Sequence, residues 1–295
     1  MKLNEYGIFR GVKPVAGRTE QEVYKSVGLP YIEPELREER GEIETAKQHR
    51  LPILLTVNDI RGDLHTHTKA TDGLSTIKEM AEAARKKGYE YLAITDHTQH
   101  VTAAHGLDVT RLSKHIEEID RIRESVTGLY LLKSAEVDIL EDGSLDLPDE
   151  ILRKLDLTVC AVHSHFHLSR NKQTERIIRA MDNPYFTIFA HPTGRLLGER
   201  QSYELDLERI IKAALERRCF LELNAQPLRL DLSDVHCRLA KEMGLKLVIS
   251  SDAHSATELD YMRFGVAQAR RGWLEAENVL NTKSWKDLKN LIRRA

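Results

Sequence analysis

Two histidines stand one residue apart in the stretch RGDLHTHTKATDG, which spans residues 61–73. Residues two positions apart on a β-strand project to the same side, so His65 and His67 can reach the same metal ion. Neutral imidazole is a common metal ligand in proteins. The pair alone also fits two ordinary histidines near the end of a strand, so the rest of the chain has to decide between the two interpretations.

Further side chains that can bind metal follow other apolar runs of the sequence. A single histidine at such a position is usually a hydrogen-bonded core or surface residue, but repetition at one strand end after another favours a shared metal site. In a parallel barrel the carboxyl ends of the strands meet on one face, where active sites form. The side chains predicted at these ends are Asp96, His97, Glu136, His163, His165, His191, Asp252 and His254.

The kinds of ligand narrow the choice of metal. Imidazole and carboxylate groups without a nearby thiolate suit Mn, Zn or Fe in an open catalytic site. The cysteines Cys160, Cys219 and Cys237 are widely separated in the sequence, which disfavours a structural zinc site and predicts buried, reduced thiols. More than four candidate ligands imply more than one ion.

The charge of such a site indicates what it would bind. The carboxylates of Asp72, Glu136 and Asp252 with neutral histidines give the empty site a charge of about −3, which three divalent ions would change to about +3. A loaded site therefore favours an anion, and phosphate is the obvious candidate.

The elements that must position these residues follow a regular alternation from about residue 58 onward. Amphipathic stretches such as LERIIKAALERR precede nearly continuous apolar runs such as CFLELNAQ. Such runs are typical of parallel strands that are buried on both faces. Six pairs, preceded by the strand that leads into GDLHTHT, predict about seven parallel strands and an α/β barrel about one unit short of eight.

Residues 1–57 differ in composition and apolar periodicity from the rest of the chain. Prolines, dense charge and few periodic apolar residues predict a short helical or irregular extension, made of turns and one short helix, that connects rather than forms a core.

Composition excludes several functional classes. The chain has 295 residues, 41% of them hydrophobic and 31% charged, with a formal net charge of −2. No global charge attracts nucleic acid or an anionic membrane, so any polyanion must be bound locally. The N-terminus lacks a secretory apolar region and no window approaches the length of a membrane span, so a cytoplasmic protein without membrane partners is expected.

The motifs DLHTHTKATDG, ITDH, AEVDI, VHSHF, AHPTGR and SDAH, in this order, resemble the PHP (polymerase and histidinol phosphatase) domain. The stretches GLPYIEPELREERGEIE, DILEDGSLDLPDE and LELNAQPLRLDL resemble most the C-terminal PHP domain of bacterial family X DNA polymerases. The resemblance assigns residues 58–295 to the PHP domain and residues 1–57 to the end of a polymerase thumb with its linker.

This resemblance implies a distorted (β/α)7 TIM-like barrel and a trinuclear centre of divalent ions with nine ligands. Carried onto matching positions of this chain, the ligands are His65, His67, Asp72, His97, Glu136, His163, His191, Asp252 and His254.

The implied activity is metal-dependent hydrolysis of phosphoesters, foremost as a 3′–5′ exonuclease on DNA 3′ ends. The alternatives are a phosphomonoesterase similar to histidinol phosphatases, acting on a small phosphomonoester, and a non-catalytic module that docks to a polymerase in cis or in trans. Residues 1–57 leave no room for the palm, finger and lyase parts of a family X polymerase, so polymerase activity is not predicted.

Residues near the ligands are candidates for other roles. Arg195 follows a strand end that carries a ligand, and its guanidinium could bind a phosphate. Asn224 and Arg229 follow the one strand without a predicted ligand and are candidate substrate contacts. Asp96 could orient a ligand imidazole, and His165 is expected to face substrate or solvent rather than metal.

Overall fold

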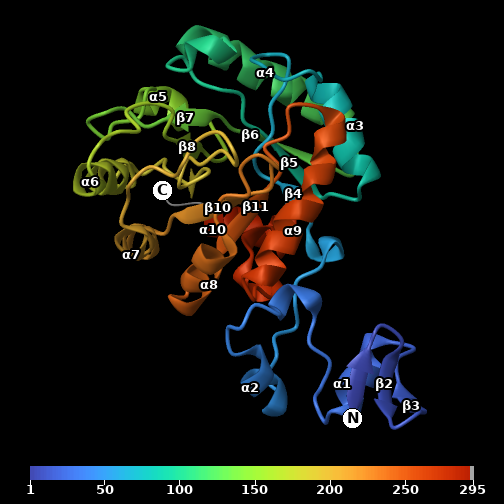
Figure 1. Ribbon diagram of the computed structural model, residues 1–295. Coiled ribbons are helices and arrows are strands. Elements are labelled where there is room, and N and C mark those ends of the chain that lie inside the picture. The colour runs from blue at the N-terminus through green and yellow to red at the C-terminus, as the bar shows by residue number, and fades with distance from the viewer. Residues whose placement is uncertain (293–295) are drawn as a thin grey trace. The chain divides into compact units, whose positions relative to one another are not determined.

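The computed structural model describes residues 1–292 and divides into two units, with the division between Leu54 and Leu55. We call Met1–Leu54 the N-terminal unit and the remainder the barrel unit. In Figure 1 the N-terminal unit is drawn in dark blue, and the barrel unit runs from light blue to red.

The N-terminal unit is more ordered than the sequence suggested. The expectation of turns and one short helix is wrong, because three short strands form an antiparallel sheet in the order β1-β2-β3. Their few residues are mostly exposed and show no apolar alternation, so they left no periodic signal. Gly7 and Gly17 allow the backbone to approach closely, since a Cβ on Gly7 would lie 2.3 Å from the carbonyl oxygen of Ala16. The elements are β1 (Lys2–Asn4), β2 (Gly7–Arg10), β3 (Lys13–Ala16), α1 (Glu20–Ser26), the 3₁₀ turn η1 (Pro34–Leu36) and α2 (Glu42–Lys47).

The barrel unit confirms the predicted α/β fold with parallel strands. Its strands form two parallel sheets, in the orders β4-β5-β6 and β11-β10-β9-β8-β7. Segments β6 and β7 come from one run of chain that is interrupted at Ser134 and Ala135, so seven successive strand positions result, as the sequence predicted. The strands are β4 (Gly62–Asp63), β5 (Tyr91–Ile94), β6 (Tyr130–Lys133), β7 (Glu136–Asp138), β8 (Val159–Ala161), β9 (Ile188–Phe189), β10 (Phe220–Asn224) and β11 (Leu247–Ser250).

The two sheets are joined on both sides at the carboxyl ends of their strands. A parallel bridge pairs His97 with Glu136 on one side, and another pairs Thr66 with Ala253 on the other. The fully buried side-chain amide of Asn281 donates to the carbonyl oxygens of Gly62 in β4 and Ile249 in β11, at 2.8 Å from each oxygen. One side-chain amide thus replaces backbone pairing where β4 and β11 lie apart.

Helices surround the strands (Figure 1). Helix α3 is typical: Thr76 and Glu79 form a capping box at its start, and Ile77, Met80 and Ala84 are buried at helical spacing. The helices are α3 (Ile77–Lys86), α4 (Val109–Ser125), α5 (Asp149–Leu152), α6 (Arg170–Ala180), α7 (Leu207–Arg217), α8 (Asp234–Glu242), α9 (Met262–Arg271) and α10 (Trp285–Ile292).

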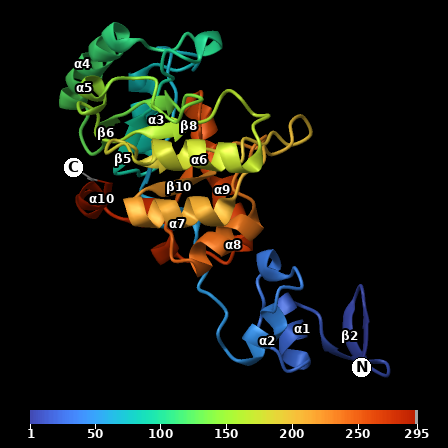
Figure 2. The same ribbon diagram turned by 90° about the vertical axis from the view of Figure 1, so that its left-hand side faces the viewer.

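Alternate strand residues divide the core into two clusters. Leu92 and Ile94 of β5 belong to the cluster beneath the helices, whereas Tyr91 and Ala93 belong to a second, interior cluster. Leu288 and the end of α10 join the interior cluster, and α10 lies at one edge of the barrel unit in Figure 2. The amino end of the barrel is therefore filled with apolar side chains, which leaves the carboxyl end for polar chemistry. Within residues 1–292, none of the helices combines the length and apolar character needed to cross a membrane.

Candidate metal centre

The structure brings all nine predicted ligands together at the carboxyl ends of the strands. Glu136, the first residue of β7, lies at the centre of the group. Its Oε1 atom is 2.8 Å from Nε2 of His191 and 3.2 Å from Nε2 of His163. Its Oε2 atom is 2.9 Å from Nδ1 of His97. One carboxylate thus contacts imidazoles that follow three different strands, which suits a bridging ligand.

Four donor atoms of this group lie close together around the imidazoles of His65 and His67. They are Nε2 of His65, Nε2 of His67, Oε2 of Glu136 and Oδ1 of Asp252. Five of the six distances among them measure 3.1, 3.1, 3.4, 3.5 and 3.6 Å. A tetrahedral zinc ion with bonds of about 2.0–2.1 Å holds its ligand atoms about 3.3 Å apart. His65, His67 and Asp252 therefore fit a single divalent cation, and Glu136 lies beside both imidazoles.

A second set of donors surrounds Asp72. Its Oδ2 atom lies 3.4 Å from Nε2 of His97 and 3.5 Å from Nε2 of His254. The ring of His67 stacks on that of His254, with 4.2 Å between the ring centroids. Counted with the donors around Glu136, three overlapping groups of possible ligands result: His65, His67 and Asp252; His97, Glu136 and His163; and His67, Asp72, His97 and His254.

The centre holds its charged groups away from water. Glu136 is 1% exposed and His65 and His67 are fully buried. Burial opposes ionisation of Glu136, but the imidazoles of His97 and His65 outweigh it and hold the pKa of the carboxyl group well below its usual value. Burial acts on Asp252 in the same way, and His65 and His67 keep its pKa well below the usual value. The carboxylates therefore stay ionised and attract cations.

The histidines respond in opposite directions to the same surroundings. Burial and the neighbouring His97 and His254 lower the pKa of His67 to about 4. Burial also disfavours the charged form of His97, but Glu136 and Asp72 raise its pKa to about 10. Within the described chain, Nδ1 of His67 has no hydrogen-bond partner. A buried, neutral imidazole with an unsatisfied nitrogen among carboxylates fits a metal ligand.

The backbone holds two of the ligands in an unusual conformation. His191 has φ of +28° and Asp252 has φ of +54°, in the left-handed region that non-glycine residues rarely adopt. The amide of Asp252 donates to the carbonyl oxygen of His65 at 3.0 Å, across the join between the sheets. Such conformations persist where the surrounding structure enforces them, and they cluster at functional sites.

Two buried acids that sequence analysis did not single out support the ligands. Glu222 of β10 accepts from Nδ1 of His65 at 2.8 Å and from the amide of His191 at 2.7 Å. Asp138 of β7 lies 3.1 Å from Nδ1 of His163. A partner on one ring nitrogen leaves the other nitrogen free to bind metal. The available signal was an acid inside each apolar run, in LEL and EVD.

Asp96 has a different position from the one expected. Its carboxylate contacts no ligand imidazole among its described hydrogen bonds and ion pairs, so the prediction that it orients one is wrong. It accepts from the amide of Thr68 at 2.8 Å and from the hydroxyl of Thr71 at 2.7 Å, and it lies 2.9 Å from Nε2 of the buried His115. Asp96 therefore fastens the loop that carries Asp72.

The side chains of Asn224 and Arg195 donate hydrogen bonds to other groups within the protein. The amide nitrogen of the fully buried Asn224 donates at 3.0 Å to Glu222 and at 3.0 Å to Asp252, so its contacts position a ligand rather than reach outward. The guanidinium of Arg195 donates to the carbonyl oxygens of Arg229 and Leu230. It thereby holds the segment that carries Arg229.

Arg229 is the predicted substrate contact that faces the centre. Its Nε atom lies 3.4 Å from Oδ2 of Asp252. His165 is exposed, and its nearest acidic partner is Glu141, with 3.8 Å between Nδ1 and Oε2. A pocket of about 290 Å³ opens over the centre and is lined by Asp72, His97, Val101, Ala103, Ala104, Glu136, His163, Arg229, Asp252 and His254.

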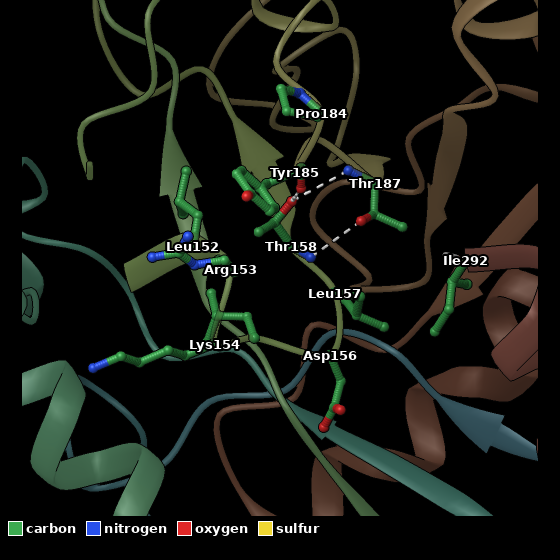
Figure 3. A pocket seen from close by; sticks show the side chains of 11 residues that line it. Leu152, Arg153, Lys154, Asp156, Leu157, Thr158, Pro184, Tyr185, Thr187 and Ile292 are labelled. Carbon is green, nitrogen blue, oxygen red and sulfur yellow. Dashed lines mark hydrogen bonds between the residues drawn. The ribbon is translucent and has the colours of Figure 1, made fainter. Parts of the chain in front are cut away.

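A second cavity, of about 410 Å³, lies at the other end of the strands. Figure 3 shows Thr158 and Thr187, which precede β8 and β9, together with Arg153 and Lys154 beside it. Two of the predicted metal ligands, His163 and His191, follow the same two strands at their carboxyl ends. None of the predicted site residues is among the described residues that line this cavity, so its greater volume does not make it the site.

Comparison with known proteins places these features in families. The model of the DNA polymerase beta thumb matches residues 1–38, and that of the PHP domain matches residues 63–226. The Bacillus subtilis protein named DNA polymerase/3′-5′ exonuclease PolX is 42% identical over 99% of this chain. The chain spans about half the length of that relative, 51%.

Shorter relatives and a solved structure agree with the barrel. A protein of Thermoanaerobacter sp. strain X514 named a probable phosphatase is 33% identical, over 75% of this chain and 89% of its own length. The crystal structure of histidinol phosphate phosphatase from Lactococcus lactis, complexed with zinc, L-histidinol and phosphate, matches with a TM-score of 0.51 at 14% identity. It covers 71% of this chain and 93% of that protein, and it supports the fold alone. By the match over residues 63–226 and the relative covered over 89% of its length, this chain belongs to the PHP domain family.

Proposed function

We propose that the barrel unit is a metal-dependent phosphoesterase that removes nucleotides from the 3′ ends of DNA as a 3′–5′ exonuclease. The observation that carries this proposal is the set of donor atoms on His65, His67 and Asp252, spaced for a single cation beneath an open pocket, with Glu136 within 3.5 Å of both imidazoles. Such a centre binds anions when loaded, and Arg229 adds a fixed cation at its edge.

The polynucleotide substrate is supported by the relatives. The Bacillus subtilis protein that matches 99% of this chain bears the name of a polymerase and 3′-5′ exonuclease. The polymerase thumb match at residues 1–38 suggests a polymerase module as partner, in cis or in trans. We propose a cytoplasmic location, as expected for a DNA-processing enzyme with reduced, buried cysteines.

The nine ligands and their three overlapping groups suit three divalent ions, and their chemistry permits Mn, Zn or Fe. When bound, the ions would hold a phosphoryl oxygen and lower the pKa of a bound water towards about 7. The chain's own residues do the rest. Glu222 and Asp138 contact Nδ1 of His65 and of His163, which leaves Nε2 of each imidazole to face the centre. Asn224 holds Asp252 in place, and Arg195 holds the segment from which Arg229 can contact the phosphate.

The reaction forms one bond and breaks another. A water oxygen bonds to phosphorus as the bond from phosphorus to O3′ of the preceding nucleotide breaks, and that O3′ gains a proton. The terminal nucleotide leaves as a 5′-monophosphate, and the shortened strand keeps a 3′ hydroxyl.

A phosphomonoesterase is the second candidate. The probable phosphatase of Thermoanaerobacter, with 89% of its length covered by this chain, favours it. The ligands would act in the same way, and a small alcohol would leave instead of a DNA strand. A non-catalytic module is the third candidate, and the complete set of ligands argues against it.

One assay separates these candidates. Protein loaded with Mn²⁺ is expected to shorten a 5′-labelled oligonucleotide one nucleotide at a time, and the double variant His65→Ala with His67→Ala is expected to lose this activity. His167→Ala, which removes an exposed histidine of the same barrel, is the matched control. Release of phosphate from histidinol phosphate with an intact oligonucleotide would favour the phosphomonoesterase, and inertness towards both would favour the module.

A further inference from the structure

The pocket over the metal centre has one apolar wall. Val101, Ala103 and Ala104 line it, and the last two belong to the 3₁₀ turn η3 (Thr102–Ala104). The remaining lining residues are predicted metal ligands and Arg229. The pocket therefore has a charged side that would suit a phosphate once divalent ions are bound, and an apolar side that the proposed hydrolysis of the phosphoester bond does not use.

The wall is fixed directly to a ligand. The segment between His97 and Leu107 closes on itself, with the amide of Leu107 donating to the carbonyl oxygen of His97 at 2.8 Å. Gly106 lies so close to Thr98 that a Cβ there would stand 2.0 Å from the carbonyl oxygen of Thr98. The segment also pairs through a bridge between Thr98 and Leu107. The apolar side chains are thus held at a set distance from the centre.

The size and chemistry of the pocket limit what can occupy it. Its volume of about 290 Å³ lies at the lower end for small-ligand sites, which begin near about 300 Å³. It suits one nucleotide rather than several. The side chains of Val101, Ala103 and Ala104 carry no hydrogen-bond donor or acceptor. They can cover the flat apolar face of a base, but they cannot read the polar edge by which bases differ.

We infer that this wall seats the sugar and base of the 3′-terminal nucleotide, whose 5′-phosphate lies over the metal ligands, without distinguishing the four bases. The inference rests on the proposed function and adds a substrate-positioning surface to it. A small phosphomonoester whose leaving alcohol carries an ammonium group would need acidic or polar partners, which this wall lacks.

The test compares nucleotide binding with phosphate binding in the full chain loaded with Mn²⁺. Titration calorimetry measures the Kd of the four deoxynucleoside 5′-monophosphates and of inorganic phosphate. The wild-type protein is expected to bind every nucleotide at least about 10-fold more tightly than phosphate, as burial of apolar surface provides. The four nucleotides are expected to agree within about 5-fold, because no side chain of the wall can read a base edge.

Two substitutions in the same turn separate the wall from its surroundings. Ala103→Phe fills the pocket and is expected to raise the Kd of all four nucleotides by about 10-fold or more, while the Kd of phosphate stays unchanged. Thr102→Phe adds the same ring at an exposed neighbour outside the pocket lining and is expected to change neither. Both positions are exposed, so folding is preserved, and melting temperatures check this.

The outcomes separate the inference from the proposed function. Three results would overturn the inference. The nucleotides could bind no more tightly than phosphate, or their Kd values could differ by more than about 10-fold between bases. The two phenylalanine variants could also change nucleotide binding equally. Nucleotide binding as expected, with an oligonucleotide left intact, would overturn the proposed exonuclease and leave the nucleotide site standing. Cleavage of DNA with unchanged nucleotide binding in Ala103→Phe would overturn the inference alone.

Discussion

The carboxylate of Glu222 accepts a hydrogen bond from His65, with 2.8 Å between Oε1 and Nδ1. Because this contact places the proton on Nδ1, it leaves Nε2 of His65 to face His67 and Asp252. The strand β10, which supplies no predicted ligand, therefore orients a ligand that follows β4.

The first prediction follows from this contact. Glu222→Gln keeps the shape of the side chain but weakens the hydrogen bond to His65, so the affinity for Mn²⁺ or Zn²⁺ should fall by about 10- to 100-fold. Competition with a chelator measures this affinity. Glu199→Gln, at an exposed position, is the control. Equal affinities in the two variants would show that the contact does not tune the site.

Arg229 and Arg195 should differ in their effects. Arg229→Ala removes the cation at the pocket and should lower kcat/KM on DNA, measured at saturating Mn²⁺, by about 10- to 100-fold. Arg195→Ala should lower it less, because Arg195 acts through the carbonyl groups of the segment that carries Arg229. Arg121→Ala, on the exposed face of α4, is the control. A larger loss in Arg195→Ala would reverse the assigned roles.

Asp96 should contribute stability that depends on pH. Burial opposes its ionisation, but His115 and Thr71 help hold its pKa at about 2, below the usual 3.8. A carboxyl group whose pKa is lowered on folding stabilises the fold at pH values above its pKa in the unfolded chain. That stability is lost as the pH falls towards its pKa in the folded protein. The free energy of unfolding of Asp96→Asn should lie about 1–3 kcal/mol below wild type at pH 7.

Denaturant unfolding at several pH values measures this difference. The gap between wild type and Asp96→Asn should narrow from about pH 4 towards pH 2, as the wild-type carboxylate gains a proton. A gap that stays constant over this range would mean that the charge of Asp96 is not what holds the loop.

Metal binding should release protons. Without metal, Glu136 and Asp72 outweigh burial and raise the pKa of His97 to about 10, and Asp72 helps raise that of His254 to about 9. Both imidazoles are charged at pH 7.5 and must lose a proton to bind an ion. Calorimetry in buffers of different ionisation enthalpy should detect this release, and the apparent affinity should rise with pH. Binding without proton release would contradict these protonation states.

The sequence predicts most of the ligands because they stand near the ends of apolar strands, and parallel strands bring their carboxyl ends together. Asp72 stands at no strand end, and the family resemblance supplied it. The sequence predicts the supporting residues less well. Glu222 and Asp138 lie within apolar runs, where an acid could face either side of the sheet. The hydrogen bonds of Arg195 and Asn224 are decided by the return of the chain near Leu230 and Asp252, which no local pattern records.

The strands of the N-terminal unit were missed for a different reason. Its strands have three or four residues and are mostly exposed, so they carry no apolar alternation. Their pairing depends on turns and on the close approach of Gly7 and Gly17, which propensity does not reveal.

Anomalous diffraction from crystals soaked in Mn²⁺ tests the central claim most directly. An anomalous peak bounded by Nε2 of His65, Nε2 of His67 and the carboxylates of Glu136 and Asp252 is the predicted result, with further peaks beside Asp72 and His163. Crystals that take up manganese elsewhere and show no anomalous density between these side chains would contradict it.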